Sequence, residues 1–195
     1  MINLAVFASG NGSNFSAISA AVKKGMPGVR LKILVCDNPE AFVVKRARKE
    51  KVPVVLVRRR DFRKRSDFEA AIIGRLKEYK IGLIALAGFM RMLSPRFVKI
   101  YRNRVLNIHP SLLPDFKGAH AIRDAFGKGV PFTGVTVHFA DEQMDHGQVI
   151  LQQKIEIRKT DTLFSLERRI HRLEHKLYPE AIRLFCGGKI RGARR

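Results

Sequence analysis

Short apolar runs alternate with amphipathic segments along the first half of the chain. Residues 2–8, 29–36 and 52–57 are β-prone, and each run is followed by a segment whose apolar residues have helical spacing. Residues 81–87 are apolar throughout, which is typical of a strand buried on both faces of a parallel sheet. This alternation of strand and helix predicts a parallel sheet covered by helices.

The pattern changes in the second half of the chain. Residues 105–108 form an apolar strand, which has to end at about His109 because Pro110 cannot donate to a sheet ladder. Residues 133–139 and 148–157 alternate apolar with polar positions, so we expect two half-buried strands that pair with each other. The predicted fold is therefore α/β, a Rossmann-like three-layer α/β/α sandwich with a mostly parallel sheet and an antiparallel C-terminal strand pair.

Length and composition fit one globular domain. The chain has 195 residues, of which 46% are hydrophobic, enough for a substantial core. Its only cysteines are Cys36 and Cys186, which argues against a disulfide framework and for a reducing compartment. No apolar stretch is long enough to cross a bilayer. We expect a soluble cytoplasmic protein in which residues 1–195 form a single domain.

The charge balance is strongly positive, with 38 Lys and Arg against 17 Asp and Glu and a formal net charge of +21. Such a field attracts polyanions, whether RNA, phosphorylated metabolites or acidic cofactors. Part of the charge lies in a basic loop over residues 58–65 and in a basic tail over residues 187–195. The loop could be a phosphate clamp beside the glycine turn described below, and both segments could equally be solvated surface.

Asn107 and His109 are the first candidates for chemistry. Because they are two residues apart on a strand, their side chains point to the same side, about 6–7 Å apart. The C-terminal edge of an open α/β sheet is also where such folds bind ligands. A buried amide and a buried imidazole need partners, but nearby backbone groups could supply them. The strand alone therefore leaves a functional and a structural interpretation open.

A glycine turn, Gly10-Asn11-Gly12-Ser13-Asn14, lies between the first expected strand and the first expected helix. Glycine lets a ligand approach the backbone, and a helix N-terminus offers free N–H groups to an anion. The turn is not a GxGxxG fingerprint, since Phe15 stands where the third glycine would be, and it is not a P-loop. It suits a phosphate monoester better than a dinucleotide, although a tight turn before a capped helix has the same pattern.

An acidic segment over residues 141–147 separates the last two expected strands. A carboxylate in this segment could reach His109 if the fold places both loops at one edge of the sheet. Asp145 could then orient or charge the imidazole. The alternative is an ordinary acidic surface turn.

A long amphipathic helix is expected over residues 162–185, and it carries His171, Glu174 and His175. These residues match the H-x-x-E-H signature of some zinc proteases. That kind of site needs a further ligand from another segment, and the sequence offers no obvious one. We therefore expect no metal, and we interpret the motif as a solvated helix face or as a glutamate that binds a hydroxyl group.

Taken together, these segments resemble the folate-dependent phosphoribosylglycinamide formyltransferases of purine synthesis, also called glycinamide ribonucleotide transformylases. The similarity runs in order from about the first residue to about Pro179. The matching segments are Ala8-Ser9-Gly10-Asn11-Gly12-Ser13-Asn14, Leu86-Ala87-Gly88-Phe89-Met90-Arg91, Leu106-Asn107-Ile108-His109-Pro110-Ser111-Leu112-Leu113-Pro114, Gly134-Val135-Thr136-Val137-His138-Phe139, Asp145-His146-Gly147, Glu174-His175 and Tyr178-Pro179. One departure is Gln148, because the family commonly has proline after the glycine of the acidic segment.

The resemblance implies the formyltransferase fold and a set of residues for each part of the site. The implied catalytic residues are Asn107, His109 and Asp145. The residues implied to hold the substrate phosphate are Gly12, Ser13 and Asn14, and Glu174 is implied to bind the ribose. The residues implied to line the folate site are Met90, Arg91, Met92, Leu93, Ala140 and Asp141. The Leu113–Pro114 peptide bond is expected to be cis.

The implied reaction transfers a formyl group from the co-substrate 10-formyltetrahydrofolate to the amino group of glycinamide ribonucleotide. The amine attacks the formyl carbon directly. Asn107 and His109 would stabilise the charged oxygen of the tetrahedral intermediate, and Asp145 would assist proton transfer. Residues 1–100 would form a phosphate-binding half, and residues 101–185 a folate-binding and catalytic half.

Other proteins fit parts of the sequence. Methionyl-tRNA formyltransferase and formyltetrahydrofolate hydrolase also use formyl folate, but each carries an additional domain that we do not find in this sequence. A basic α/β RNA-binding protein with a vestigial pocket would account for the charge without catalysis. We expect small-molecule substrates, a monomer or a homodimer, no membrane association, and no nucleic-acid binding beyond non-specific attraction by charge.

Overall fold

The computed structural model describes residues 1–190, so residues 191–195 of the predicted basic tail lie outside the described part. The strands are β1 (Ile2–Phe7), β2 (Val29–Cys36), β3 (Val54–Leu56), β4 (Leu83–Leu86), β5 (Val105–His109), β6 (Phe132–Phe139) and β7 (Val149–Glu156). The helices are α1 (Ser13–Lys23), α2 (Phe42–Lys49), α3 (Arg65–Glu78), α4 (Pro95–Ile100), α5 (Ala121–Gly127) and α6 (Leu163–Cys186), with a 3₁₀ turn η1 (Arg59–Asp61).

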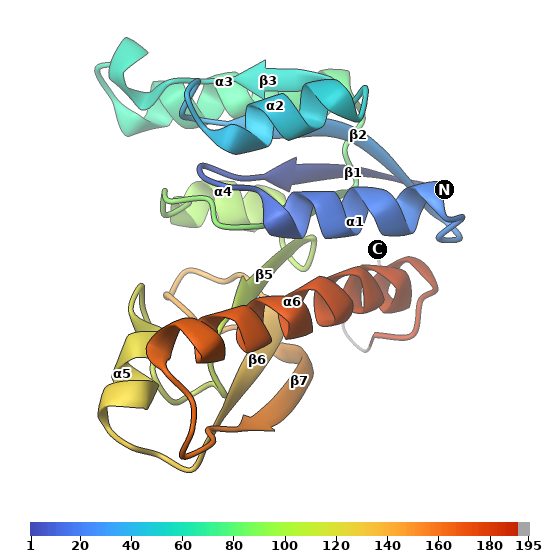
Figure 1. Ribbon diagram of the computed structural model, residues 1–195. Coiled ribbons are helices and arrows are strands. Elements are labelled where there is room, and N and C mark those ends of the chain that lie inside the picture. Colours follow the sequence, from blue (N-terminus) through green and yellow to red (C-terminus); the bar gives the residue numbers. More distant parts are fainter. Residues whose placement is uncertain (191–195) are drawn as a thin grey trace.

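All the strands belong to one sheet, in the order β3-β2-β1-β4-β5-β6-β7 (Figure 1). Strands β1 to β5 pair in parallel, whereas β6 is antiparallel to β5 and β7 is antiparallel to β6. The predicted mostly parallel sheet with an antiparallel C-terminal pair is therefore confirmed. Because β1, β4 and β5 are parallel neighbours, the loops that follow them emerge at one edge of the sheet.

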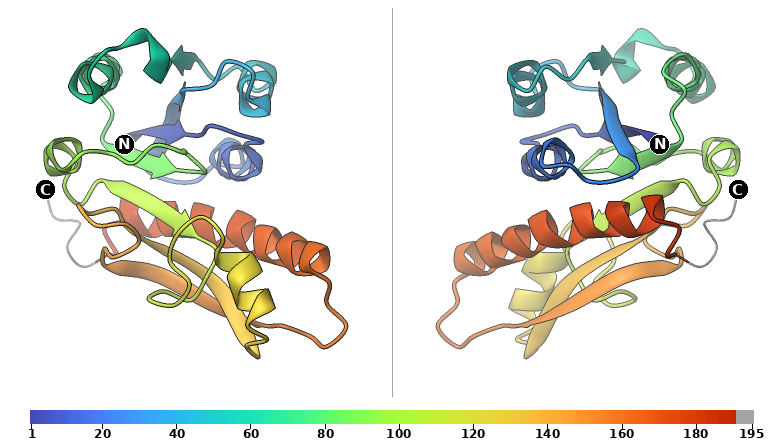
Figure 2. Two further views of the ribbon diagram at one scale, coloured as in Figure 1. Left: turned by 90° about the vertical axis from the view of Figure 1, so that its left-hand side faces the viewer. Right: turned by 90° about the vertical axis from the view of Figure 1, so that its right-hand side faces the viewer.

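Helices cover both faces of the sheet, which makes the predicted three layers (Figure 2). Buried residues of α1, α2 and α6 pack together against one face. Buried residues of α3 and α4 pack against the other face, together with the opposite side chains of β1 and β4. The central strands are almost completely buried, so they appear in the sequence as continuous apolar runs.

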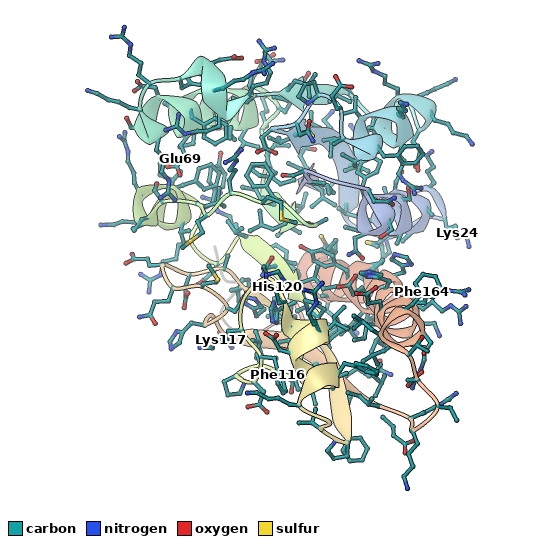
Figure 3. All side chains as sticks on the ribbon, turned by 60° about the vertical axis from the view of Figure 1, so that its left-hand side comes forward. Lys24, Glu69, Phe116, Lys117, His120 and Phe164 are labelled. Atoms are coloured by element: carbon teal, nitrogen blue, oxygen red, sulfur yellow. The ribbon has the colours of Figure 1, made fainter. Side chains whose placement is uncertain are left out.

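Side chains determine where α4 begins. Ser94 caps α4 by accepting a hydrogen bond from the Phe97 N–H at 3.2 Å, and Pro95 follows it at the first helical position. The buried Glu69 carboxylate of α3 accepts hydrogen bonds from the Ser94 N–H at 2.7 Å and from the Ser94 hydroxyl. Glu69, which is labelled in Figure 3, therefore joins α3 to the start of α4.

The boundaries differ from the predicted ones by a few residues. The third strand spans only Val54–Leu56 where residues 52–57 were predicted, because only these residues pair with β2. The basic loop predicted over residues 58–65 contains η1. Helix α3 begins at Arg65, which was predicted to be the last residue of this loop. Within residues 1–190, no helix is both long enough and apolar enough to cross a membrane.

Tyr178 of α6 links that helix to the middle of the sheet. The residue is fully buried. Its hydroxyl lies 2.8 Å from the Leu86 carbonyl oxygen at the end of β4 and 2.9 Å from the Leu106 carbonyl oxygen of β5. A buried carbonyl group without a hydrogen-bond donor destabilises the folded state, because it has lost its contact with water and gained no partner. The tyrosine hydroxyl therefore fixes α6 against the strand ends from which the site loops emerge.

We expect Tyr178→Phe to lower the free energy of unfolding by about 1–3 kcal/mol, because the two buried carbonyl groups lose the single O–H donor that they share while the ring keeps its packing. Urea denaturation followed by circular dichroism measures this. The control is Tyr79→Phe at a half-buried position, for which we expect a change below about 0.5 kcal/mol. Equal stabilities of the Tyr178→Phe variant and the wild type would contradict a structural role for the hydroxyl.

Candidate active site

A cavity of about 270 Å³ is lined by the loops after β4 and β5 and by the segment after β6. Because β6 is antiparallel to β5, that last segment begins beside Val105 at the start of β5 and returns toward the strand ends. The predicted catalytic residues Asn107, His109 and Asp145 all line the cavity. All the predicted folate-site residues line the same cavity: Met90, Arg91, Met92, Leu93, Ala140 and Asp141. The structure thus gathers residues that are up to 55 positions apart in the chain around one space.

Asp145 is at the centre of the polar end of this cavity. Its side chain is only 8% exposed. Its Oδ1 accepts a hydrogen bond from the Asn107 amide at 3.3 Å, and its Oδ2 accepts one from the Gly118 N–H at 3.0 Å. The Nδ1 atom of His109 lies 3.4 Å from Oδ2, and the Nε2 atom of His138 lies 3.7 Å from Oδ1. The acidic segment is therefore no ordinary surface turn.

The surroundings of Asp145 keep it ionised at neutral pH. Burial by itself raises the pKa of this carboxyl group. Hydrogen bonds involving His138 and the Gly118 N–H, with the charges of His109 and His138, outweigh burial and bring the pKa below its ordinary value of 3.8. A carboxylate that stays charged inside a largely apolar cavity can accept a proton or hold a cation during a reaction.

Hydrogen-bond complementarity assigns the protons around Asp145. The Nδ1 of His138 lies 2.8 Å from the Phe139 carbonyl oxygen, which can only accept, so Nδ1 carries a proton. When the His138 ring is neutral, its Nε2 is an acceptor for the Asn107 Nδ2 at 3.1 Å. When the ring is charged, Nε2 carries a proton and faces Asp145, and this is the state in which His138 lowers the pKa of that carboxyl group. The contact with the neutral ring fixes the orientation of the Asn107 amide, whose two N–H groups face His138 and Asp145.

The same reasoning applies to His109. Its Nε2 lies 2.8 Å from the Phe116 carbonyl oxygen, so Nε2 is a donor, and its Nδ1 faces the carboxylate of Asp145. An imidazolium ring satisfies both neighbours, whereas a neutral ring satisfies only one. Phe116 lies in the connection between β5 and α5, where Figure 3 also labels Lys117 and His120.

Close backbone contacts hold the acidic segment against the strands. A Cβ atom added to Gly147 would lie 1.8 Å from the Phe139 carbonyl oxygen, so only glycine fits there. The Phe139 N–H donates to the Gln148 carbonyl oxygen at 2.9 Å, a bond that proline at position 148 would also supply. Asp141 braces the segment by accepting from the Gln143 N–H at 2.9 Å and contacting His146 Nδ1 at 3.1 Å.

The segment after β5 is held in the same way, and the expected cis Leu113–Pro114 bond is present. The Thr136 hydroxyl donates to the Ser111 carbonyl oxygen at 2.7 Å and accepts from the Leu113 N–H at 3.1 Å. Neighbouring strand β6 therefore shapes the connection that carries the Phe116 carbonyl and the Gly118 N–H. Both of these backbone groups contact catalytic candidates.

The apolar wall of the cavity comes from the loop after β4. The side chains of Met90 and Met92 are 73% and 58% exposed, an unusual state for large apolar groups that favours contact with a ligand. Ser9 and Asp37 hold this loop. The Ser9 hydroxyl accepts from the Met90 N–H at 3.0 Å and donates to Asp37 at 2.6 Å, and Arg91 Nε lies 2.7 Å from the same carboxylate.

The glycine turn and Glu174 meet elsewhere at the surface between α1 and α6. Gly12 precedes α1 with φ +78°, and an added Cβ would lie 2.3 Å from Val43. The Asn14 amide donates to Glu174 at 3.0 Å, and the Asn14 amide oxygen is buried without a partner among residues 1–190. Glu174 is itself only 5% exposed. Asn14 and Glu174, which were both predicted to bind the ribonucleotide, are therefore in contact, and they lie beside the free N–H groups at the start of α1.

The H-x-x-E-H motif forms part of this second cluster. His171 Nδ1 donates to Glu174 at 2.9 Å, and this bond raises the pKa of His171 against the effect of burial. Burial lowers the pKa of His175, and its Nε2 has no hydrogen-bond partner within the described residues. Among residues 1–190, no group of three or more His, Cys, Asp or Glu side chains is arranged to hold a metal ion.

Two contributors were missed by the sequence analysis. His138 stands opposite Asn107 in the antiparallel pair of β5 and β6, so the two side chains share a face. Arg46 holds the glycine turn by donating to the carbonyl and side-chain oxygens of Asn11 at 2.9 and 3.0 Å. A histidine at position 138 of an alternating strand could have indicated a site residue, but which residue stands opposite it depends on the register of β5 and β6. Nothing in the pattern of α2 singled out Arg46.

Comparisons with known proteins identify the family to which the chain belongs. The family profile described as formyl transferase matches residues 2–182. The chain is 45% identical over 192 residues to the phosphoribosylglycinamide formyltransferase of Bacillus subtilis (strain 168), a match that covers 98% of both chains.

Solved structures give the same result. The glycinamide ribonucleotide transformylase 1 of Geobacillus kaustophilus superposes with a TM-score of 0.92 at 46% identity, covering 95% of this chain and 99% of that one. The corresponding protein of Symbiobacterium toebii has a TM-score of 0.94 at 40% identity, covering 100% of this chain and 92% of that one. These matches confirm the predicted resemblance, and the chain is a transferase that belongs to the formyl transferase family.

Proposed function

We propose that this enzyme transfers a formyl group from 10-formyltetrahydrofolate to the amino group of glycinamide ribonucleotide in purine biosynthesis. The observation that carries the proposal is the cavity in which a buried, ionised Asp145 contacts Asn107 and lies beside His109. The names of the relatives support the same substrates. An absorbance assay of folate product release with both substrates present tests it, and no release in the presence of both substrates would refute it.

The residues of the cavity fit a reduced folate. Exposed Met90 and Met92 offer an apolar wall to a flat aromatic ring system. The backbone and side-chain polar groups of residues 140–145 offer donors and acceptors to its nitrogen-rich end. When bound, this co-substrate supplies the formyl group, and the remaining chemistry belongs to the side chains of the protein.

Asn107 and His109 would stabilise the negative charge that develops on the formyl oxygen. Their contacts with Asp145, at 3.3 and 3.4 Å, are the longest polar contacts that each makes in this cluster. Long hydrogen bonds are weak, so little free energy is lost when Asn107 and His109 donate to an oxyanion in place of Asp145. Catalytic hydrogen bonds also often shorten only when substrate is bound. The shorter contacts with His138 and Phe116 would keep the amide and the imidazole in place during the exchange.

Asp145 would help to move the proton of the attacking amine toward the departing nitrogen of the folate. A group of this kind has to be ionised before the reaction and within reach of the proton, directly or through water. The lowered pKa of Asp145 meets the first requirement. Its position on the cavity wall supports the second.

The ribonucleotide would bind with its phosphate at the start of α1 and its ribose at Glu174. The N–H groups after Gly12 are free to bind an anion, and Asn14 shares Glu174 with His171. In this division, residues 1–100 supply the phosphate site and residues 101–185 supply most of the catalytic site. We further propose cytoplasmic action on small molecules, as a monomer or a homodimer.

We expect Asp145→Asn to preserve the fold and to lower kcat by roughly 10²–10⁴-fold, because the variant cannot accept a proton. Steady-state formyl transfer with saturating substrates measures the effect. Asp124→Asn, on the exposed side of α5, is the matched control and should keep normal turnover. Turnover of the Asp145→Asn variant close to that of the wild type would rule out the assigned role.

We expect Glu174→Gln to raise KM for the ribonucleotide about tenfold or more, since a charged hydrogen-bond acceptor for Asn14 and His171 is lost. KM for the folate should change by less than about twofold, because Glu174 does not line the folate cavity. Glu180→Gln, near the end of the same helix, serves as the control. An equal rise in both KM values would show that Glu174 has only a structural role.

The raised pKa of His171 gives a pH dependence with a definite sign. A group whose pKa is raised by folding stabilises the protein below its ordinary pKa of 6.5, and this contribution is lost as the pH rises through the folded-state pKa. We therefore expect His171→Gln to destabilise the protein more at about pH 5.5 than at about pH 8.5. Urea unfolding at both pH values measures the difference, and an NMR titration of the ring should show the pKa falling in Glu174→Gln.

A further inference from the structure

Arg46 of α2 contacts the glycine turn from outside the set of residues proposed to bind the ribonucleotide. Helices α1 and α2 lie side by side on one face of the sheet (Figure 1). The Arg46 Nε donates to the Asn11 carbonyl oxygen at 2.9 Å, and Nη2 donates to the Asn11 side-chain oxygen at 3.0 Å. Nη1 lies 3.4 Å from the hydroxyl of Ser16, in the first turn of α1. Every nitrogen of the guanidinium therefore contacts the turn or the helix that follows it.

The turn needs support from outside, because its own residues restrict the backbone weakly. Asn11 lies between Gly10 and Gly12, and glycine has the greatest backbone freedom of any residue. Helix α1 also begins without a side-chain cap. Helix α2 supplies the support at two points, since the Val43 N–H donates to the Gly10 carbonyl oxygen at 3.1 Å and Arg46 holds Asn11. The direction of the free N–H groups after Gly12 thus depends on α2.

The contacts of Arg46 orient its guanidinium without neutralising it. Its hydrogen-bond acceptors are neutral oxygen atoms, and the ring of Phe42 lies 4.8 Å from its central carbon. The charge also acts on α6: burial lowers the pKa of His175, and the charge of Arg46 contributes in the same direction. Arg46 could therefore aid phosphate binding by charge or by holding the turn. Engagement of all its nitrogens favours the second role.

We propose that Arg46 is a positioning residue for the phosphate of the ribonucleotide, which acts by holding Asn11 and so directing the free N–H groups after Gly12. The inference rests on the proposed function, because it concerns the phosphate of that substrate. A guanidinium binds two oxygen atoms in a fixed planar geometry, whereas the ammonium group of lysine carries the same charge without that geometry. Arg46 does not line the folate cavity, so the role is confined to the ribonucleotide.

The test compares glycinamide ribonucleotide with the riboside that lacks the phosphate. We expect Arg46→Ala to raise KM for the ribonucleotide about tenfold or more, because displaced N–H groups bind the phosphate poorly. The folate KM, and kcat/KM for the riboside, should each change by less than about twofold. A role in overall stability alone would lower kcat/KM for the ribonucleotide and the riboside equally.

Arg46→Lys separates geometry from charge. Because lysine cannot bridge both Asn11 oxygens in the same way, we expect KM for the ribonucleotide to stay at least about fivefold above that of the wild type. Arg48→Ala is the matched control, since Arg48 is an exposed arginine of the same helix and its loss changes the net charge equally. This control should keep the KM values of the wild type.

Three outcomes would overturn the inference: an unchanged ribonucleotide KM in Arg46→Ala, an equal loss of kcat/KM with the riboside, or complete recovery in Arg46→Lys. Circular dichroism checks the folding of each variant. Asn11→Ala provides a second approach that leaves α2 intact, because it removes one of the two acceptors. It should raise the ribonucleotide KM by a smaller factor, and no rise would also count against the role.

Calorimetry with ribose 5-phosphate measures phosphate binding without formyl transfer. We expect Arg46→Ala to weaken this binding and Arg48→Ala to leave it unchanged. If the wild type transfers no formyl group to any substrate while Arg46→Ala still weakens ribose 5-phosphate binding, the proposed reaction is wrong and the positioning role stands. Equal binding of ribose 5-phosphate by the wild type and Arg46→Ala would refute the positioning role by itself.

Discussion

A buried carboxylate needs partners, and the arrangement of this active site follows from supplying them to Asp145. An ionised carboxylate is costly to bury unless hydrogen bonds and opposite charge surround it. Here the partners come from β5, from β6 and from the connection between β5 and α5. The acidic segment has to fold back over the sheet edge to bring Asp145 to them, and Gly147 permits that close approach. One charge therefore determines how three segments meet.

Helix α6 joins the two ligand regions. Glu174 faces the glycine turn, and Tyr178, one turn later, holds the ends of β4 and β5. Burial and the nearby charge of Glu174 raise the pKa of Tyr178 well above its ordinary value, so the hydroxyl stays a donor to the strand carbonyls. The same helix therefore positions the residues proposed for the ribonucleotide and those proposed for the formyl group.

The positive charge of the chain does not by itself determine which anion binds. A net charge of +21 raises the local concentration of any anion, but it does not select one. Selection requires groups in fixed positions, such as the helix start beside Asn14 that we propose for the ribonucleotide phosphate. This helix start follows β1, at the edge where the parallel strands end.

The hydrophobic pattern by itself predicted the strands and helices of the first half and their parallel sheet, because hydrophobic period is a local property of the chain, but it did not give the order of the strands. It also placed Asn107 and His109 on one side of a strand that Pro110 ends. Only the tertiary structure decided that His138 stands opposite Asn107, that Asp145 reaches both, and that Arg46 holds the glycine turn. Register and loop closure depend on contacts between residues far apart in sequence, and no local pattern encodes those contacts.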